Sequence, residues 1–273
     1  MTALRLHALE LHLTDRDVRI LEDLEQFRLL TTRQIQRLHL PANPFGDHAT
    51  VSAATRGTTR ILTRLEGIGA VARLERRIGG LKHGSALTVW HLGSAGERHL
   101  RARRGDSVRR RYSEPSRAFM AHTLAIGDIA VALRERAFAG RFELLELAAE
   151  PACWRPFTAP GGIPITLKPD LTVVTADART ETHSFVEIDC GTEHLPVLIR
   201  KCRLYQQYFA TGIEQQARGL FPAVVWLVPT TKRADAIRAA ITADGALDTS
   251  LFWVALAEQA TDQLAPYESE HHS

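Results

Sequence analysis

The sequence predicts an α/β protein with two domains, and three observations carry this prediction. The chain has 273 residues, enough for one large or two ordinary domains, and it is 45% hydrophobic and 24% charged, as globular proteins are. Apolar residues recur at helical spacing in the first third, whereas strand-like and helical stretches alternate after residue 118. Residues 1–118 carry 21 Lys and Arg against 12 Asp and Glu, and residues 119–273 carry 13 against 19. A basic front half and an acidic back half favour two domains with different partners.

The front half is expected to begin with three helices. The stretch LTDRDVRILEDLEQFRLL has Thr14 as a candidate N-cap and Asp17 three residues later, which resembles a capping box with Asp in place of Glu. The stretch LTTRQIQRLHL predicts a short second helix, capped by Thr31 or Thr32 and ended by the prolines that follow. A third helix over about residues 53–66 has an apolar stripe on one side and arginines and threonines elsewhere.

A hairpin and a further helix complete the front half. Strand-like runs over residues 71–77 and 86–92 flank a basic, glycine-rich tip, and SAGERHLRAR restarts a helix. This order, with the phrases TRILTRLEGIGAV and VWHLGSAGERHL, resembles a winged helix-turn-helix over about residues 12–104. The resemblance implies that the third helix enters the major groove of double-stranded DNA. The implied DNA contacts on this helix and on the wing are Arg56, Thr59, Arg60, Arg64, Arg76, Arg77 and Lys82. A domain of this kind that mediates protein contacts is the alternative.

An arginine-rich segment follows the hairpin and helix. Six arginines lie within residues 101–111, and Pro115 closes the segment. A solvated tether and an arm that grips phosphates explain it equally well. We therefore expect a DNA-binding domain over residues 1–104, a basic linker over residues 105–117 and a second domain over residues 118–273.

The back half is expected to follow the order α, β, β, β, α, β, α, β. The stretch SRAFMAHTLAIGDIAVALRERAFAG predicts a long helix, and RFELLELAAE predicts a strand. The stretch PACWRPFTAPGGIPI is rich in Pro and Gly and predicts a loop. The next two strands are expected in TLKPDLTVVTA and THSFVEIDCGT, followed by a helix in EHLPVLIRKCRLYQQYFATG. A fully apolar strand, FPAVVWLVPT, then precedes the helix KRADAIRAAITADG and the last strand, SLFWVAL.

Two of these strands carry carboxylates. A Pro-Asp pair ends at Asp170, and Glu187 and Asp189 lie on one face of the next strand. The pattern resembles the PD-(D/E)xK nuclease superfamily, whose restriction-endonuclease-like domain is an αβββαβ mixed sheet. The resemblance implies that Asp170, Glu187 and also Asp189 hold Mg²⁺ or Mn²⁺, since Mg²⁺ prefers hard oxygen ligands, and that the ion activates water against a phosphate. Buried like charges also tolerate a basic partner, so a structural ion-pair cluster with Arg200 or Arg203 stays open.

Asp189 stands where that superfamily normally has a lysine, and an acid cannot do the work of a lysine. Either the lysine has moved or the site does not cleave. Lys201, on the helix that follows, shares a face with Tyr205 and Tyr208 at i+4 and i+7, a face that can point back at the sheet. Lys168 is a weaker substitute. We therefore take Lys201 as the candidate catalytic lysine beside Asp170, Glu187 and Asp189.

A second similarity covers more of the chain. The stretches VEIDCGTE and RKCRLYQQY are similar to the replication-relaxation family, in which a strand ending Glu-x-Asp-x-Gly-Thr-Glu precedes a basic helix with Lys and Tyr. The resemblance extends over about residues 12–230 and makes Asp189 part of the family's own pattern. It implies a role in plasmid or mobile-element replication and DNA relaxation.

Two functions of different classes follow from these patterns. The first is a DNA-binding factor of replication with a nuclease-like domain, and the alternative is an active, Mg²⁺-dependent endodeoxyribonuclease or nickase that uses Asp170 and Glu187 with Lys201. Three scattered cysteines without a CxxC pair favour the reducing cytoplasm. No apolar run reaches the length of a membrane span, and homodimerisation is left open.

Overall fold

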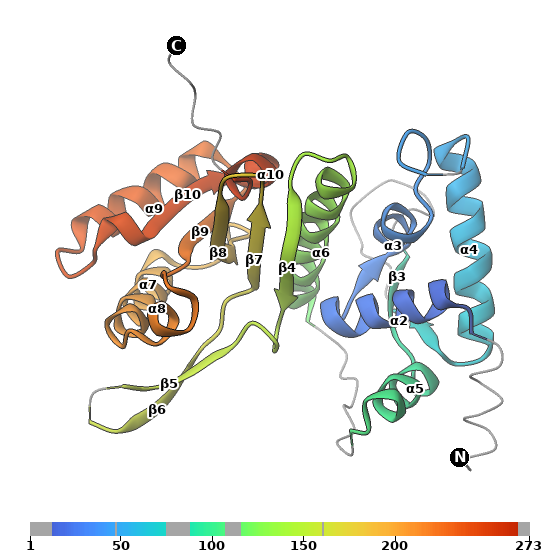
Figure 1. Ribbon diagram of the computed structural model, residues 1–273, viewed down its shortest axis with the longest axis horizontal. Coiled ribbons are helices and arrows are strands. Elements are labelled where there is room, and N and C mark those ends of the chain that lie inside the picture. The colour runs from blue at the N-terminus through green and yellow to red at the C-terminus, as the bar shows by residue number, and fades with distance from the viewer. Residues whose placement is uncertain (1–12, 47, 75–87, 107–115, 160, 267–273) are drawn as a thin grey trace. The chain divides into compact units, whose positions relative to one another are not determined.

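The computed structural model describes residues 13–46, 48–74, 88–106, 116–159 and 161–266 (Figure 1). The chain divides into two compact units, residues 1–131 and 132–273, so the division falls inside a helix. The predicted mixed α/β class is confirmed. The domain limits expected from the sequence stay a prediction, and the wing residues Arg76, Arg77 and Lys82 lie outside the described residues.

Unit 1 is built from helices and a small sheet. Its elements, in chain order, are α2 (Asp15–Phe27), β1 (Leu30–Thr31), α3 (Thr32–His39), α4 (Val51–Gly67), β2 (Val71–Arg73), β3 (Val89–Leu92), α5 (Ser94–Arg104) and the first part of α6 (Arg117–Phe138). The three strands form one antiparallel sheet in the order β1-β3-β2. The short strand β1 was not predicted, because two residues carry no periodicity.

Capping explains where the first two helices begin. The Thr14 side chain accepts from the Asp17 N–H and the Asp17 carboxylate accepts from the Thr14 N–H, so the predicted capping box is present in α2. Thr31, and not Thr32, caps α3, with Gln34 completing a second capping box. Thr32 instead accepts a 2.8 Å hydrogen bond from the Trp90 indole N–H, which ties α3 to β3.

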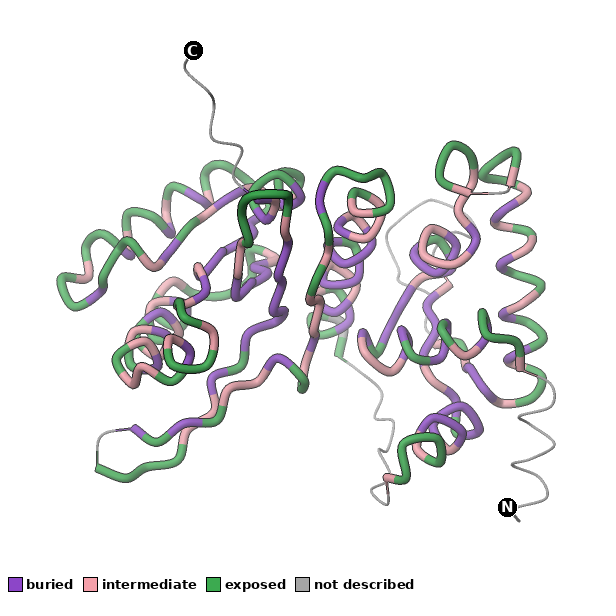
Figure 2. Tube along the Cα trace, viewed as in Figure 1, coloured by how far each residue is buried: buried purple, intermediate pink, exposed green. Residues whose placement is uncertain are grey.

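The core of unit 1 lies between the inner faces of its helices, as the buried segments of Figure 2 show. Ile20, Leu24, Ile35, Leu62 and Leu65 are at most 1% exposed. The first part of α6 belongs to this core as well: Met120 and Leu124 pack against Leu29 of the α2–β1 connection and Val89 of β3. Their burial gives α6 a packed side in unit 1.

Unit 2 is built on a five-stranded mixed sheet. After α6, its elements are β4 (Glu143–Ala149), β5 (Arg155–Ala159), β6 (Ile163–Leu167), β7 (Leu171–Ala176), β8 (Glu181–Ile188), α7 (Leu195–Ala210), α8 (Ile213–Arg218), β9 (Ala223–Val228), α9 (Thr231–Ala243), β10 (Phe252–Leu256) and α10 (Ala260–Gln263). The strand order is β10-β9-β8-β7-β4. Strands β4, β7 and β8 are antiparallel, and β8, β9 and β10 are parallel.

The sequence prediction for unit 2 misses a hairpin and a short helix. The stretch predicted as a loop contains the hairpin β5–β6, which forms a separate two-stranded sheet. Proline is tolerated there because both strands of an isolated pair are edge strands, where an absent N–H breaks no ladder bond. Strand β4 has a register shift between Leu144 and Glu146, which explains why its polar residues do not follow one face. The short helix α8 was not predicted.

Helices α7 and α9 cover one face of the sheet. Phe185 of β8 and Trp226 of β9 pack there with Leu198, Tyr205 and Ile237 of the two helices in one hydrophobic cluster. The opposite face carries the C-terminal segment, where Thr175 Oγ1 donates a 2.6 Å hydrogen bond to the Leu264 carbonyl. None of the helices in the described part of the chain is long and apolar enough to span a membrane.

Candidate functional site

The two predicted strand carboxylates lie side by side at the start of β7 and the end of β8. Leu171 pairs with Val186 in the antiparallel register, the Asp170 N–H donates a 3.1 Å hydrogen bond to the Val186 carbonyl, and the Asp170 charge acts on Glu187. The Asp170 carboxylate accepts a 2.7 Å hydrogen bond from the Ile188 N–H across the strands. Asp170 is 6% exposed and Glu187 1%. The sheet therefore holds two buried acids next to each other.

Helix α7 brings a lysine and a tyrosine to Glu187. The Lys201 ammonium donates to one oxygen of Glu187, and the Tyr205 hydroxyl donates to the other at 2.5 Å. Residues four apart lie on the same side of a helix, which is why both reach the same carboxylate. The Lys201 side chain remains 29% exposed, so the cluster opens to solvent on the lysine side.

The protonation properties of Glu187 follow from its burial. Burial raises the pKa of the Glu187 carboxyl to about 8, because the attraction of Lys201 opposes it only in part and the neighbouring Asp170 charge adds to the rise. For Lys201, burial acts to lower the pKa, but the charges of Glu187 and Asp170 outweigh it and hold the pKa above its usual value. Raised pKa values on both partners are found at functional sites and also in structural ion-pair networks.

Asp189 does not share this cluster's lysine. Its Oδ2 accepts a 2.5 Å hydrogen bond from Arg233 of α9, and its Oδ1 accepts one of 2.9 Å from the Gly191 N–H. Arg233 also donates to the Glu193 carbonyl at 2.6 Å, so the β8–α7 loop is fastened to α9. Arg200 and Arg203 were considered as partners of these acids. Arg203 instead pairs with Asp244, and the basic partners are Lys201 for Glu187 and Arg233 for Asp189.

A fourth buried acid, which sequence reasoning missed, lies on the same side of the sheet. Glu214 of α8 is 3% exposed and bonds to Arg155 at 2.5 Å, to the Tyr208 hydroxyl at 3.0 Å and to Arg218 at 3.2 Å. Arg155 also lies 5.5 Å from the centroid of the Phe185 ring. This network fastens the base of the β5–β6 hairpin to α8. In the sequence, only the position of Tyr208 on the same face of α7 as Lys201 pointed to this network.

The predicted DNA contacts of α4 are all exposed, but one of them is tied to a buried acid. Arg56, Thr59 and Arg60 are exposed, and the printed bonds of Arg56 and Thr59 are local, to Ser52 and to the Thr55 carbonyl. Arg64 is different, because its guanidinium bonds at 2.6 Å to Asp17, which is 1% exposed. Arg64 thus joins α4 to α2.

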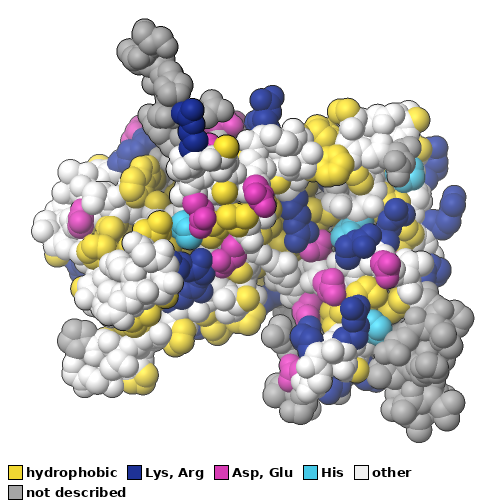
Figure 3. Space-filling model, in the orientation of Figure 1, with side chains coloured by type: hydrophobic (Ala, Val, Ile, Leu, Met, Phe, Trp, Pro, Cys, Tyr) yellow, Lys and Arg dark blue, Asp and Glu magenta, His cyan; other side chains and the backbone are white. Residues whose placement is uncertain are grey.

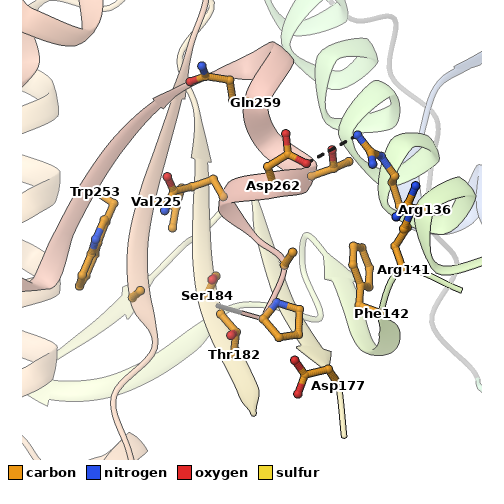
Figure 4. A pocket seen from close by; sticks show the side chains of 15 residues that line it. Arg136, Arg141, Phe142, Asp177, Thr182, Ser184, Val225, Trp253, Gln259 and Asp262 are labelled. Atoms are coloured by element: carbon orange, nitrogen blue, oxygen red, sulfur yellow. Dashed lines mark ion pairs between the residues drawn. The ribbon is translucent and has the colours of Figure 1, made fainter. Parts of the chain in front are cut away.

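A pocket of about 830 Å³ lies on the other face of the unit 2 sheet (Figure 4). Thr182 and Ser184 line it, and their alternation with Phe185 and Glu187 along β8 directs them away from α7. The 3.6 Å ion pair of Arg136 with Asp262 borders the pocket. None of the predicted site residues lines it.

The described surface mixes charges of both signs. On the face in Figure 3, acidic and basic side chains lie beside each other. Several pairs join neighbouring elements, such as Arg104 of α5 with Glu25 of α2 and Arg218 of α8 with Glu146 of β4. Within the described residues, no three His, Cys, Asp or Glu side chains gather into a metal-ligand group. Asp170 and Glu187 both act on the charge of Lys201, whereas Asp189 has Arg233 as its basic partner.

Comparison with known proteins gives one match. The family model described as replication-relaxation matches residues 21–224, about three quarters of the chain. The matched range includes α4 and all of Asp170, Glu187, Asp189 and Lys201, and it ends in β9. No curated protein matches the chain, and no solved structure does.

Proposed function

The chain belongs to the replication-relaxation family, and from this premise we propose that it is a DNA-binding protein that acts in the replication or relaxation of plasmid or mobile-element DNA. Unit 1 would dock on duplex DNA through α4. Unit 2 would supply a nuclease-like domain. Family membership supports the general role, and the docking surface and the site are argued from the residues.

The exposed side of α4 is the observation that carries DNA binding. The order α2–β1–α3–α4–β2–β3–α5 with an antiparallel β1-β3-β2 sheet agrees with that of a winged helix-turn-helix, in which α4 would be the recognition helix. Arg56 and Arg60 are exposed on it, four residues apart, and neither has a carboxylate partner among the described residues. Unpaired guanidinium groups on one face are suited to bidentate contact with phosphates or guanine.

A salt titration of duplex binding tests this proposal. Each phosphate contact that is lost should reduce the slope of log K against log salt by about 1, so Arg56→Ala with Arg60→Ala should reduce it by about 2. Arg19→Ala is the matched control, because Arg19 is exposed on α2 of the same unit. An affinity that does not depend on salt, or an unchanged slope in the double variant, would point to a protein-binding adaptor.

Metal-dependent nicking is a second candidate, and the contact of Lys201 with Glu187 favours it. The order α6–β4–β7–β8–α7–β9, with β9 parallel to β8, agrees with the αβββαβ arrangement of the nuclease superfamily. In that arrangement the lysine would follow Glu187 by two residues. Here α7 supplies it from fourteen residues away in sequence. The lysine is thus at the acid, although the strand position holds Asp189.

Asp170 and Glu187 are the residues that would hold Mg²⁺ or Mn²⁺. Two carboxylates on neighbouring strands suit Mg²⁺, which usually takes one or two protein carboxylates and keeps several waters. A bound ion would polarise the scissile phosphate and lower the pKa of its water. Asp189 would join them only after releasing Arg233, just as Glu187 would first release Lys201. Lys201 would leave Glu187 to offset charge on the phosphate, and Tyr205 would keep the Glu187 carboxylate in place.

Conversion of supercoiled plasmid to nicked circles in Mg²⁺ or Mn²⁺ tests the second candidate. Asp170→Asn and Glu187→Gln should each abolish the conversion, and Lys201→Ala should slow it about 100-fold or more, as loss of a charge-stabilising group does. Asp235→Asn is the control, because the Asp235 side chain is 67% exposed on α9. If plasmid stays supercoiled with the wild-type protein, the nicking proposal is wrong and the DNA-binding proposal stands.

A further inference from the structure

Lysine is rare in this chain, and its positions are informative. Of the 34 basic residues only four are lysines, namely Lys82, Lys168, Lys201 and Lys232. Two of the four, Lys168 and Lys201, belong to the segments that carry the carboxylate pair. Lysine offers a compact, strongly hydrated point charge, whereas arginine offers a planar fork. Lys201 has a partner in Glu187, which leaves the use of Lys168 to be explained.

The Lys168 ammonium lies over an aromatic ring at the surface. Lys168 is exposed, and its Nζ lies 4.2 Å from the centroid of the Trp154 ring. Among the described residues no carboxylate lies within ion-pair distance of it. The pairing of Arg155 with Leu167 ends the β5–β6 ladder, so Trp154 and Lys168 are the next residues outward on the two strands. The indole face attracts the cation and limits where its flexible side chain goes.

The segment between Lys168 and Asp170 is also fixed. Cys153, which precedes Trp154, is fully buried, and its Sγ donates a 3.0 Å hydrogen bond to the Pro169 carbonyl. Pro169 itself has a restricted φ angle. Cys153 and Trp154 therefore contact the chain at two neighbouring points, the Pro169 carbonyl and the Lys168 ammonium. Both points lie just before the buried Asp170. A cation two residues before an acid of the site is thus positioned by the β5–β6 hairpin.

We propose that Lys168, positioned by Trp154, is a phosphate-binding residue for DNA at the rim of the Asp170–Glu187 site. This inference rests on the proposed function, because it takes DNA as the ligand of that site. An exposed ammonium without a carboxylate partner is free to bind a backbone phosphate. The stacked indole keeps it at the rim, where it would bind a phosphate next to the one at the carboxylates. The contact is with the backbone and carries no sequence preference.

Lysine footprinting reads this contact directly, since the chain has so few lysines. The full-length protein is acylated with an amine-reactive reagent, with and without a duplex oligonucleotide, and each lysine is followed by peptide mass spectrometry. We expect acylation of Lys168 to slow several-fold with DNA while that of Lys232, exposed on α9, does not change. In the salt titration, Lys168→Ala should reduce the slope by about 1. Lys168→Arg should retain it, because a guanidinium also stacks on tryptophan.

Trp154→Leu separates positioning from charge. It keeps Lys168 but removes the ring, so we expect weaker binding with an unchanged salt slope. Equal acylation of Lys168 with and without DNA, or a slope that Lys168→Ala does not alter, would overturn the inference even if plasmid is nicked, and the proposed nicking would survive. Protection of Lys168 without any nicking would keep the contact and remove the cleavage. A protein that binds no DNA would overturn both.

Discussion

The Asp17 carboxylate links the start of α2 to α4 and should be a point of stability for unit 1. It accepts from the Thr14 N–H at 2.8 Å and from Arg64 at 2.6 Å. Burial acts to raise the pKa of Asp17, but the hydrogen bonds from Arg64 and Thr14 outweigh it, and the net pKa lies below the usual 3.8. Because the folded pKa is depressed, the stabilisation is present above the unfolded pKa and is lost as pH falls through the folded value.

Asp17→Asn should therefore lower the free energy of unfolding by about 1–3 kcal/mol at pH 7, the range for hydrogen bonds to charged groups. The gap between wild type and variant should close as the pH falls below about 4. Urea unfolding followed by circular dichroism measures both effects. Asp15→Asn is the control, since Asp15 is exposed in the same helical turn. Equal losses in the two variants would mean that helix-dipole effects, and not the Arg64 contact, dominate.

The ionised form of Glu187, which is the form that would bind a metal ion, should destabilise the fold. Its folded pKa is raised to about 8 from the usual 4.5, with burial as the largest cause. A carboxyl with a raised pKa favours the folded state at low pH, and this contribution is lost as pH rises from the unfolded to the folded value. Glu187→Gln imitates the protonated form, so its stability relative to wild type should increase between pH 5 and pH 9.

Urea unfolding at these two pH values, with Glu143→Gln as an exposed control, measures this difference. A variant that is less stable than wild type by the same amount at both pH values would show that the Lys201 and Tyr205 contacts outweigh burial. In that case Glu187 would be a structural ion-pair partner and the case for a functional site would weaken.

Two helical glycines of unit 1 should respond to alanine with opposite signs. A Cβ at Gly127 of α6 would lie 3.0 Å from both Gln34 Nε2 and Leu30 Cδ2, and the Gln34 amide already donates to the Leu124 carbonyl and to Asp128. A Cβ at Gly67, the last residue of α4, would meet no atom within 4 Å. The glycine in α6 thus permits close approach to α3, whereas the one in α4 does not serve packing.

Gly67→Ala should stabilise by up to about 1 kcal/mol through helix propensity. Gly127→Ala gains the same propensity but overpacks the α3–α6 contact at a cost of about 1–3 kcal/mol, so its net effect should be a loss. Midpoints of urea unfolding compare the two directly. A stabilised Gly127→Ala variant would show that α6 can move away from Gln34 without loss.

Local signals predicted most of the helices and strands, and their limits are physical. Thr14 and Asp17 predict the start of α2, because a capping box lies within four residues of sequence. Asp170 and Glu187 could be placed together because strand order brings adjacent strands into register. The partner of Asp189 could not be predicted, since Arg233 lies 44 residues away in sequence on a helix whose packing is tertiary. The prolines of the β5–β6 hairpin led to the prediction of a loop. Proline disfavours central strands, whereas both strands of this hairpin are edge strands.

Charge is distributed unevenly along the chain, with a basic surplus in residues 1–118 and an acidic surplus in residues 119–273. The surplus of basic residues in the front half includes the exposed arginines of α4, which fit a DNA-docking surface. The acidic surplus of the back half includes buried acids of unit 2 that have basic partners: Lys201 for Glu187, Arg233 for Asp189, and Arg155 and Arg218 for Glu214. Net charge by itself would therefore mislead about the interior of unit 2, where these three acids each face a basic group.

The place where unit 1 ends can be tested with fragments. The sequence places the limit at residue 104, but Met120 and Leu124 of α6 pack against Leu29 and Val89, and Met120 is 7% exposed. A fragment of residues 1–104 would uncover that apolar surface and leave the Gln34 amide without its two acceptors on α6.

A fragment of residues 1–138, which includes all of α6, should have a free energy of unfolding higher by roughly 3 kcal/mol than the shorter one. The gain comes from one or two buried side chains and a hydrogen bond. Urea unfolding of the two fragments measures the difference, and Met120→Ala in the longer fragment should remove about 2 kcal/mol of it or more, since Met120 is buried. Equal stability of the two fragments would mean that α6 adds nothing to unit 1, and the limit near residue 104 would hold.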